Sequence, residues 1–222
     1  MSANGLVVFG AGQIAELALF YFAEHTGRQV AALTVDGAYL REEHSLGVPV
    51  VPFEEIQQHF PPDRFDLFVA VSYSGINRLR ARKCQEAMSK GYRLPSYVSP
   101  RATVFSDLVH GWNCFILEDN TIQPRVRIGN NVTLWSGNHI GHHSTIADNV
   151  FIASHVVVSG GVAIGENAFI GVNATLRDHI RVGNFSVVGA GTVLLADTPA
   201  EAVYRAAPTE IAKVPSSRLR GI

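Results

Sequence analysis

The sequence predicts an α/β domain followed by a solenoid of short parallel strands. The main observation is a six-residue repeat: from Val98 to Leu194, every sixth residue is aliphatic except His110. A second observation is the alternation of apolar runs and helical patterns before the repeat begins. A period of six fits neither a helix nor a single strand, but it is typical of short strands that tight turns join into stacked coils.

The N-terminal part, residues 1–95, alternates between strand and helix patterns. Three apolar runs predict strands and three segments with helical spacing predict helices, in the chain order 6–9, 13–24, 30–35, 53–59, 66–72 and 76–90. Such alternation predicts a parallel sheet with helices on its faces. The domain is half the size of a full dinucleotide-binding fold, so we expect a Rossmann-like half with one nucleotide crevice.

Residues 96–197 form the predicted solenoid. If three hexads complete one turn, a coil has about 18 residues, and residues one coil apart are vertical neighbours about 4.8 Å apart. The residue before each aliphatic station faces outward, and one of the three outward columns is mainly aromatic, with Phe115, Phe151 and Phe169. An exposed apolar stripe usually marks an interface, so we expect a homotrimer to bury this column. Residues 198–222 lose the period, and we expect a tail packed on the coils.

The composition suits a well-packed globular protein that binds neither nucleic acid nor membrane. The chain has 222 residues, of which 47% are hydrophobic and 17% charged, and its net charge is -1. No basic excess is present to neutralise a phosphate backbone, and no apolar run is long enough to span a bilayer. Because the N-terminus carries no secretion signal pattern, we expect a cytoplasmic protein. Cys84 and Cys114 lie in unrelated segments, which argues against a disulfide scaffold or a structural zinc site.

The hexads that begin at Ile164, Ile170 and Val182 resemble those of hexapeptide-repeat acyltransferases, which fold as a left-handed parallel β-helix. Three further features are the Gly-rich N-terminal domain, the histidine-rich segment 137–143 and the segment 204–208. With them, the chain is similar to bacterial sugar acetyltransferases that modify nucleotide-linked amino sugars, and to their sialic-acid O-acetyltransferase relatives. The resemblance covers nearly the whole chain. It implies an enzyme of polysaccharide biosynthesis that transfers an acetyl group from acetyl-CoA to an amine on a UDP- or dTDP-linked sugar.

The same resemblance implies roles for particular residues. It places the general base at His142, and His143 stands where the family often has an acidic residue that raises the basicity of the base. A neutral His143 can orient His142 through a hydrogen bond, whereas a protonated one opposes its charging. Contacts to acetyl-CoA are implied for Phe151, Gly160, Val172 and Ala190. Contacts to the nucleotide sugar are implied for Gly10, Gly12, Gln13, Asp36, Ser72, Asn77 and Arg78.

Local patterns support part of this assignment. Gly10 and Gly12 follow a strand and open a helix, where backbone N–H groups bind phosphate. Asp36 ends the next strand, where a carboxylate can bind ribose or a base. Gly160 is the vertical neighbour of His142, either to admit a pantetheine arm or to supply a positive φ in a tight turn. The last helix carries three other cations, Arg80, Arg82 and Lys83. They either contact phosphates or lie on a solvated helix face, and we expect the solvated face for most of them.

Four histidines lie within a short stretch, at positions 139, 142, 143 and 155, which favours a functional cluster over a solvated turn. His155 either lines the acyl pocket or lies on the surface. No metal is expected, because His143 and His179 are two coils apart, about 9.6 Å, and Zn–N bonds of about 2.0–2.1 Å cannot bridge that gap within one chain.

The expected chemistry is direct attack of a sugar amine on the thioester, with His142 accepting the proton and a backbone N–H binding the oxyanion. Neither cysteine lies near the histidines in the coil register, so no acetyl-enzyme is expected. We expect acetyl-CoA to lie between adjacent subunits of the homotrimer. Two other functions stay open: O-acetylation of a sugar hydroxyl, and a non-catalytic scaffold that binds a nucleotide sugar. An NAD-dependent oxidoreductase is disfavoured, because no second nucleotide-binding half precedes the solenoid.

Overall fold

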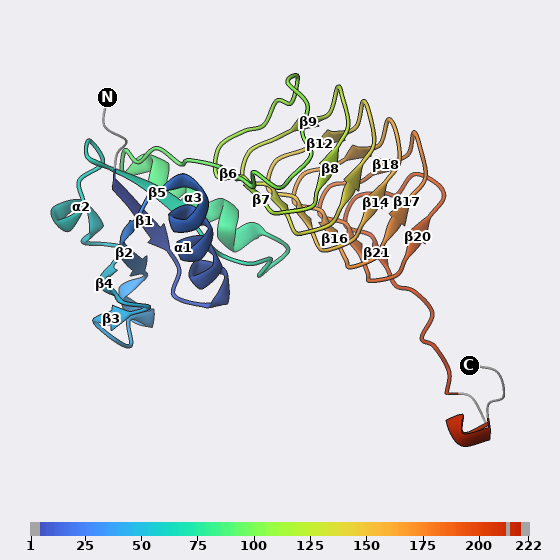
Figure 1. Cartoon of the computed structure of the whole chain (residues 1–222), viewed down its shortest axis with the longest axis horizontal. Coiled ribbons are helices and arrows are strands. Elements are labelled where there is room, and N and C mark those ends of the chain that lie inside the picture. The colour runs from blue at the N-terminus through green and yellow to red at the C-terminus, as the bar shows by residue number, and fades with distance from the viewer. Residues whose placement is uncertain (1–4, 212–213, 219–222) are drawn as a thin grey trace.

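The computed structural model describes residues 5–211 and 214–218, and it shows an α/β domain joined to a stack of triangular coils (Figure 1). The sheet of the α/β domain has the strand order β3-β4-β2-β1-β5. Its strands are β1 (Gly5–Phe9), β2 (Val30–Val35), β3 (His44–Ser45), β4 (Val48–Pro52) and β5 (Phe65–Val69). The helices are α1 (Gln13–Thr26), α2 (Ile56–His59) and α3 (Arg78–Ser89), with a 3-10 turn, η1, at Gly37–Tyr39.

The predicted alternation of strands and helices is confirmed, but the sheet has two further strands, β3 and β4, that the sequence did not predict. β1, β2, β4 and β5 are parallel, but β3 pairs antiparallel with β4, so the sheet is mixed. The turn between β3 and β4 holds Leu46 at φ 54° and Gly47 at φ 79°. Leucine is uncommon at positive φ, so this hairpin gives little signal in the sequence. α1 packs on one face of the sheet, and α2 and α3 pack on the other.

The coils consist of two-residue strands in three parallel sheets, which we call sheets I, II and III. Sheet I holds β6 (Tyr97–Val98), β7 (Phe115–Ile116), β10 (Thr133–Leu134), β13 (Phe151–Ile152), β16 (Phe169–Ile170), β19 (Val187–Val188) and β21 (Val203–Tyr204). Sheet II holds β8 (Thr121–Ile122), β11 (His139–Ile140), β14 (Val157–Val158), β17 (Thr175–Leu176) and β20 (Val193–Leu194). Sheet III holds β9 (Arg127–Ile128), β12 (Thr145–Ile146), β15 (Ala163–Ile164) and β18 (Arg181–Val182).

Strand pairing confirms the predicted coil of three hexads. Residues one coil apart are direct partners in all three sheets, as in Thr133 with Phe151, His139 with Val157, and Thr145 with Ala163. From β7 on, successive strands of the sequence lie in different sheets, and each sheet is parallel throughout. The expected left-handed parallel β-helix after a small α/β domain is therefore confirmed.

Aliphatic side chains fill the interior of the coils. Every station of the repeat from Ile116 to Leu194 is at most 4% exposed. The corner turns need a residue in the left-handed conformation, and asparagine or histidine often supplies it, as at Asn149 (φ 64°) and His143 (φ 59°). The first coil is less regular, because after β6 it pairs with the next coil only through isolated bridges. The expected inward station at Val104 is therefore wrong, and this side chain is 41% exposed.

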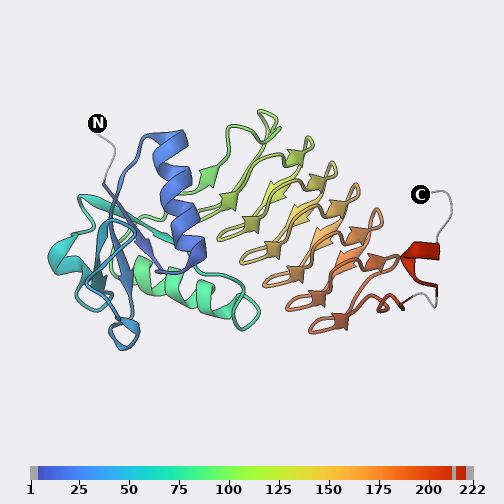
Figure 2. The same ribbon diagram turned by 60° about the horizontal axis from the view of Figure 1, so that its bottom comes forward.

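The α/β domain covers the first strands of sheet I, so Phe115 and Phe151 of the aromatic column are buried within the chain, whereas Phe169 is partly exposed. Phe68 of β5 packs against Phe115, with ring centroids 5.3 Å apart, and Phe151 contacts Tyr73 and Phe169. α1 and α3 lie on the side of the domain that faces the coils (Figure 2). The expectation that a homotrimer buries this column is therefore wrong for Phe115 and Phe151, because residues of the same chain already cover them.

Arg80 of α3 fixes the domain to the corner between sheets III and I. Its guanidinium donates to Asn131 Oδ1 (3.1 Å), Asn149 O (2.9 Å) and Asn77 Oδ1 (3.1 Å), and the residue is 2% exposed. Burial lowers the pKa of Arg80 to about 10, so the guanidinium stays charged at neutral pH. The expectation that these cations are solvated is wrong for Arg80, which is buried, and is confirmed for Arg82, which is exposed. Along the same corner the amide side chains hydrogen-bond one another from coil to coil, in the order Asn113, Asn131, Asn149 and Asn167.

The segment after the coils begins in contact with them and then leaves. β21 pairs with β19 and so adds a last strand to sheet I. From Arg205 on, every described residue is exposed, and the chain runs away from the coils toward the 3-10 turn η2 (Ser216–Arg218) (Figure 1). The expected packing of residues 198–222 therefore needs correction, because the chain stays against the coils only as far as Ala206. Residues 212–213 and 219–222 lie outside the described ones.

Among the described residues, no helix combines the length and the apolar character that crossing a membrane requires.

Candidate active site

His142 and His143 lie at the corner between sheets II and III, in the turn that follows β11. Gln123 Oε1 accepts a hydrogen bond from the backbone N–H of His142 (2.9 Å). The Nδ1 atoms of the two imidazoles are 3.1 Å apart, and the rings meet at 85°. Both side chains are exposed. Within the described part of the chain, Nε2 of His142 has no partner, so this nitrogen is available to a substrate.

The position of the His142 ring explains why residue 160 is a glycine. A Cβ atom on Gly160 would lie 2.6 Å from Cε1 and 2.8 Å from Nε2 of His142, so the imidazole rests directly on the glycine backbone. The predicted vertical contact of these two residues is confirmed, but for a reason that the sequence did not suggest. The positive φ of this turn belongs to Gly161 (φ 68°) instead, and the space above Gly160 holds the ring itself.

The other histidines do not join this pair. His139 lies in β11 on sheet II, and His155 lies at the corner between sheets I and II, where its ring packs over a glycine of the preceding coil. His179 lies one coil after Gly161, and its ring packs over that glycine. It is therefore two coils away from His143. The expected cluster of four histidines is therefore wrong and reduces to two. In residues 5–211 and 214–218, no group of three His, Cys, Asp or Glu residues is arranged to hold a metal ion.

The residues implied for acetyl-CoA do not form one surface within a single chain. Gly160 lies beside the histidine pair, whereas Val172 and Ala190 are exposed at the corner between sheets I and II. Phe151 is 5% exposed, and its ring lies 5.1 Å from that of Tyr73. A contact between acetyl-CoA and Phe151 therefore needs correction, because the α/β domain covers this ring.

A cavity of about 450 Å³ lies at the carboxyl ends of β1 and β5, beside the start of α1. Gly10, Gly12, Gln13 and Ser72 all line it, as do Ile14, Ala70, Val71 and Tyr73. Gly10 has φ 126°, and a Cβ there would lie 2.7 Å from Ala70 O, so only glycine fits this turn. No side chain of the described residues caps α1, which leaves its first N–H groups free to bind an anion.

Asp36 follows β2 as expected, but its carboxylate is paired within the chain. Lys83 Nζ lies 2.6 Å from Asp36 Oδ1 and 2.6 Å from Glu86 Oε2. Lys83 is 5% exposed and lies over the rings of Phe9 and Phe53, so the expectation of a solvated position is wrong here too. Beside the end of β2, a cavity of about 190 Å³ is lined by Ala11, Val35, Tyr39, Arg41, Glu42, Ser45 and Val50. Sequence reasoning missed it because η1 and the β3–β4 hairpin, which build it, were not predicted.

Asn77 and Arg78 hold the two parts of the chain together. Asn77 is fully buried, and its Nδ2 donates to Asn167 O (3.0 Å). The guanidinium of Arg78 lies 4.4 Å from the centre of the Phe185 ring and 4.0 Å from the carboxylate of Glu201. The expected contact of Asn77 with a nucleotide sugar needs correction, because this side chain is buried against the coils. The side chain of Arg78 is 56% exposed, and its contact with a nucleotide sugar stays a prediction.

The glycine-lined cavity and the histidine pair lie on opposite sides of the coils. Tyr73, from the wall of the cavity, contacts Phe151 and Phe169 of sheet I, at 5.1 Å and 4.8 Å between ring centroids. His142 lies at the corner formed by the other two sheets. The interior of the triangular coil therefore separates these two candidate subsites within one chain.

The repeat matches the family model described as bacterial transferase hexapeptide (six repeats), at residues 125–160 and 161–196. Among solved structures, the chain is similar to a histidine-to-asparagine mutant of perosamine N-acetyltransferase from Caulobacter crescentus, in complex with CoA and GDP-perosamine. The identity is 27%, the match covers 91% of this chain and 93% of that chain, and the TM-score is 0.81.

Two further structures are similar. The acetyltransferase domain of PglB from Neisseria gonorrhoeae, in complex with acetyl coenzyme A, has 26% identity over 90% of this chain and 96% of that chain, with a TM-score of 0.80. WeeI from Acinetobacter baumannii shares the fold at 17% identity, over 90% and 96% of the two chains, with a TM-score of 0.73. A search of curated protein sequences finds no match.

Proposed function

We propose that this hexapeptide-repeat acyltransferase transfers the acetyl group of acetyl-CoA to an amino group on a nucleotide-linked sugar. The observation that carries the proposal is the exposed His142–His143 pair, in which one imidazole is held by a neighbouring ring and a glycine backbone and is free at Nε2. The Caulobacter relative is in complex with CoA and GDP-perosamine and the Neisseria relative with acetyl-CoA, which supports the same pair of substrates here.

His142 serves as the general base in this proposal. A sugar ammonium must lose protons before and during attack, and histidine is the side chain that exchanges protons most readily near neutral pH. For Nε2 to accept a proton, Nδ1 of the neutral ring must carry the hydrogen. Nδ1 of His143, 3.1 Å away, then accepts that hydrogen bond. His143 is thus a positioning residue, and it must be neutral to do this.

The transfer itself is direct. The amine nitrogen forms a bond to the carbonyl carbon, the carbon–sulfur bond breaks, and the CoA thiolate takes the proton that His142 has accepted. Gly160 lies against the His142 ring, and its backbone N–H has no acceptor among the described residues, so we assign this N–H to the oxyanion. Both reacting groups then meet at one edge of the imidazole.

The cysteines do not take part in this scheme. Cys84 lies under the α/β sheet and Cys114 lies inside the coils, and both are buried. Burial raises the pKa of the Cys84 thiol to about 12 and also raises the pKa of Cys114. Neither thiol therefore ionises near neutral pH, which supports a mechanism without an acetyl-enzyme.

Two protomers complete the proposed site. A nucleotide sugar held in the cavity of Gly10 and Gly12 cannot reach His142 of its own chain, because the coil lies between them. A homotrimer brings the cavity of one protomer to the histidine corner of the next. It also explains why the implied acetyl-CoA contacts lie on two corners, because the groove between coils can be formed by Gly160 of one protomer with Val172 and Ala190 of its neighbour.

An acceptor screen tests the proposal. The protein is incubated with acetyl-CoA and UDP-, dTDP- or GDP-linked amino sugars, and release of the CoA thiol is followed together with the mass of the product. UDP and dTDP sugars are the expected acceptors, and the GDP sugar is added because of the Caulobacter relative. The matched control is the same nucleotide sugar with a hydroxyl in place of the amine. The proposal fails if no acceptor is acetylated, or if the hydroxyl compounds are acetylated as fast as the amines.

A further inference from the structure

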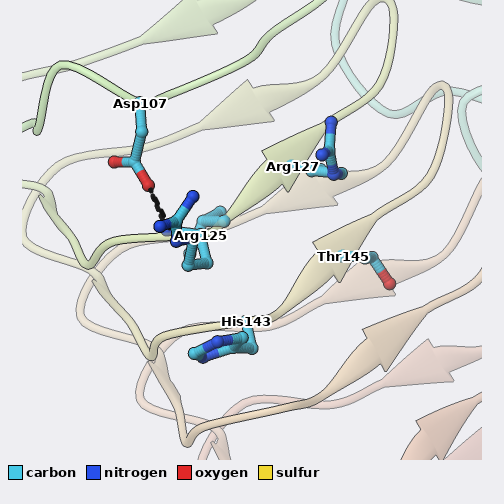
Figure 3. Close-up of a pocket in the computed structure, with 6 residues that line it drawn as sticks. Asp107, Arg125, Arg127, His143 and Thr145 are labelled. Atoms are coloured by element: carbon cyan, nitrogen blue, oxygen red, sulfur yellow. Dashed lines mark hydrogen bonds and ion pairs between the residues drawn. The ribbon is translucent and has the colours of Figure 1, made fainter.

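A cavity of about 320 Å³ opens beside His143 on sheet III (Figure 3). Three successive coils build it, and its walls are formed by Asp107, Arg125, Val126, Arg127, His143 and Thr145. Only His143 among these residues has a role in the proposed chemistry. The cavity therefore adds an unassigned set of charged and polar side chains next to the orienting imidazole.

The walls of this cavity carry an uncompensated positive charge. Asp107 Oδ2 accepts a hydrogen bond from the backbone N–H of Arg125 (2.8 Å) and lies 3.8 Å from its Nε, the contact drawn in Figure 3. Arg127 is exposed, and across the described ranges its side chain forms neither an ion pair nor a hydrogen bond. Thr145, the direct strand partner of Arg127, places a hydroxyl on the same wall.

We propose that this cavity binds an anionic group of the acceptor substrate, with Arg127 as its main ligand. The proposal rests on the acetyl-transfer function above. A guanidinium binds a carboxylate or phosphate through two parallel hydrogen bonds, and in a concave wall it does so with a defined orientation. Asp107 offsets the charge of Arg125, so Arg127 carries the net positive charge of the cavity, and the hydroxyl of Thr145 adds one further donor.

The order of the coils assigns the anion to the acceptor and not to acetyl-CoA. The cavity lies on the coils that lead up to His143, whereas Gly160, Val172 and Ala190 lie on later coils. His143 forms a wall of the cavity, and the other ring of the pair rests on Gly160. The two substrates then approach the free nitrogen of His142 from opposite ends of the stack. The anion is either a phosphate of the nucleotide or a carboxylate on the sugar, and both present the same oxyanion chemistry.

A matched pair of variants tests the role of Arg127. Arg181 faces outward in the same column of sheet III, is also exposed and does not line the cavity, so Arg181→Gln controls for loss of a surface charge. Arg127→Gln should raise the KM for the acceptor about tenfold, which equals about 1.4 kcal/mol, with kcat and the KM for acetyl-CoA unchanged. Arg127→Lys should lie between, and Arg181→Gln should match the parent. An unchanged acceptor KM in Arg127→Gln, or a change in the KM for acetyl-CoA alone, overturns the proposal.

Calorimetric titration identifies the anion and does not depend on turnover. The parent protein and Arg127→Gln are titrated with UDP or GDP and, separately, with glucuronic acid. Weaker nucleoside diphosphate binding to the variant assigns the cavity to a phosphate, and weaker glucuronic acid binding assigns it to a sugar carboxylate. Equal affinity of the two proteins for every ligand overturns the proposal. If the variant loses anion binding but the parent acetylates no sugar amine, the anion site stands and the acetyl-transfer function fails.

Discussion

Replacing Arg80 with methionine tests whether hydrogen bonds hold the α/β domain on the coils. Methionine keeps a long apolar chain at this buried position but removes the guanidinium. Asn77 Oδ1, Asn131 O and Asn149 O then lose a donor that now lies 3.1, 3.2 and 2.9 Å away. A buried acceptor that loses its donor costs about 1–3 kcal/mol, and release from the burial of a cation offsets part of the sum. We expect a net loss of about 3 kcal/mol in the free energy of unfolding.

A loss of that size lowers the melting temperature by roughly 6–12 °C in a chain of this length. Thermal melts followed by circular dichroism measure it, with Arg82→Met as the control. Arg82 lies on the same helix, its side chain is 64% exposed, and its ion pair is with Glu86 one turn away, so its loss should cost below about 0.5 kcal/mol. Arg80→Lys keeps the charge but not the fork of donors and should fall between the two. If Arg80→Met has the same melting temperature as the Arg82→Met control, the reasoning is refuted.

Four further predictions concern the histidine corner and the alkaline stability of the fold. His142→Asn should lower kcat by about 100-fold or more without changing the melting temperature, and near-parental turnover would remove its role as base. His143→Asp should move the acidic limb of the pH–rate profile to higher pH, because a carboxylate stabilises the protonated form of His142; an unmoved limb would contradict the contact between the two rings. Gly160→Ala should lower kcat about tenfold, because the new Cβ displaces the imidazole, and full activity would show that the ring position does not matter. Burial and the hydrogen bond to Glu118 raise the pKa of Tyr21 from 10.0 to about 12, so its contribution to stability is present below pH 10 and is lost as the pH rises toward 12. Urea unfolding across that range should show a shallower alkaline decline for Tyr21→Phe, and identical declines would argue against the shift.

The coils could be predicted closely because their signal is local and repeated. Each hexad places one aliphatic side chain in the core, so the six-residue period shows where the strands lie and which strands pair. It also predicts the contact between His142 and Gly160. The resemblance to hexapeptide-repeat sugar acetyltransferases drawn from those hexads is confirmed. The same register also places His155 at another corner, a signal that counting along the coils could have found.

What could not be predicted depends on packing between distant segments. Helix cations are usually solvated, so nothing near Arg80 or Lys83 indicates that the asparagine column and Asp36 surround them. The aromatic column likewise predicts a partner but does not say which, and Phe115 is covered by the same chain instead of a second copy. Arg127 was missed for the opposite reason, because a lone surface arginine becomes notable only when the cavity around it is seen.

The His142 imidazole packs on the backbone of Gly160 in the following coil, and this contact restricts how the gene can change in length. Duplication of a whole coil downstream lengthens the prism and leaves every column in line. Insertion of a single hexad between positions 143 and 159 turns all later residues by one face and moves Gly160 away from the His142 ring. Natural variants of this enzyme should therefore differ by whole coils beyond Gly160, and the interval between the base and its glycine should keep a constant length.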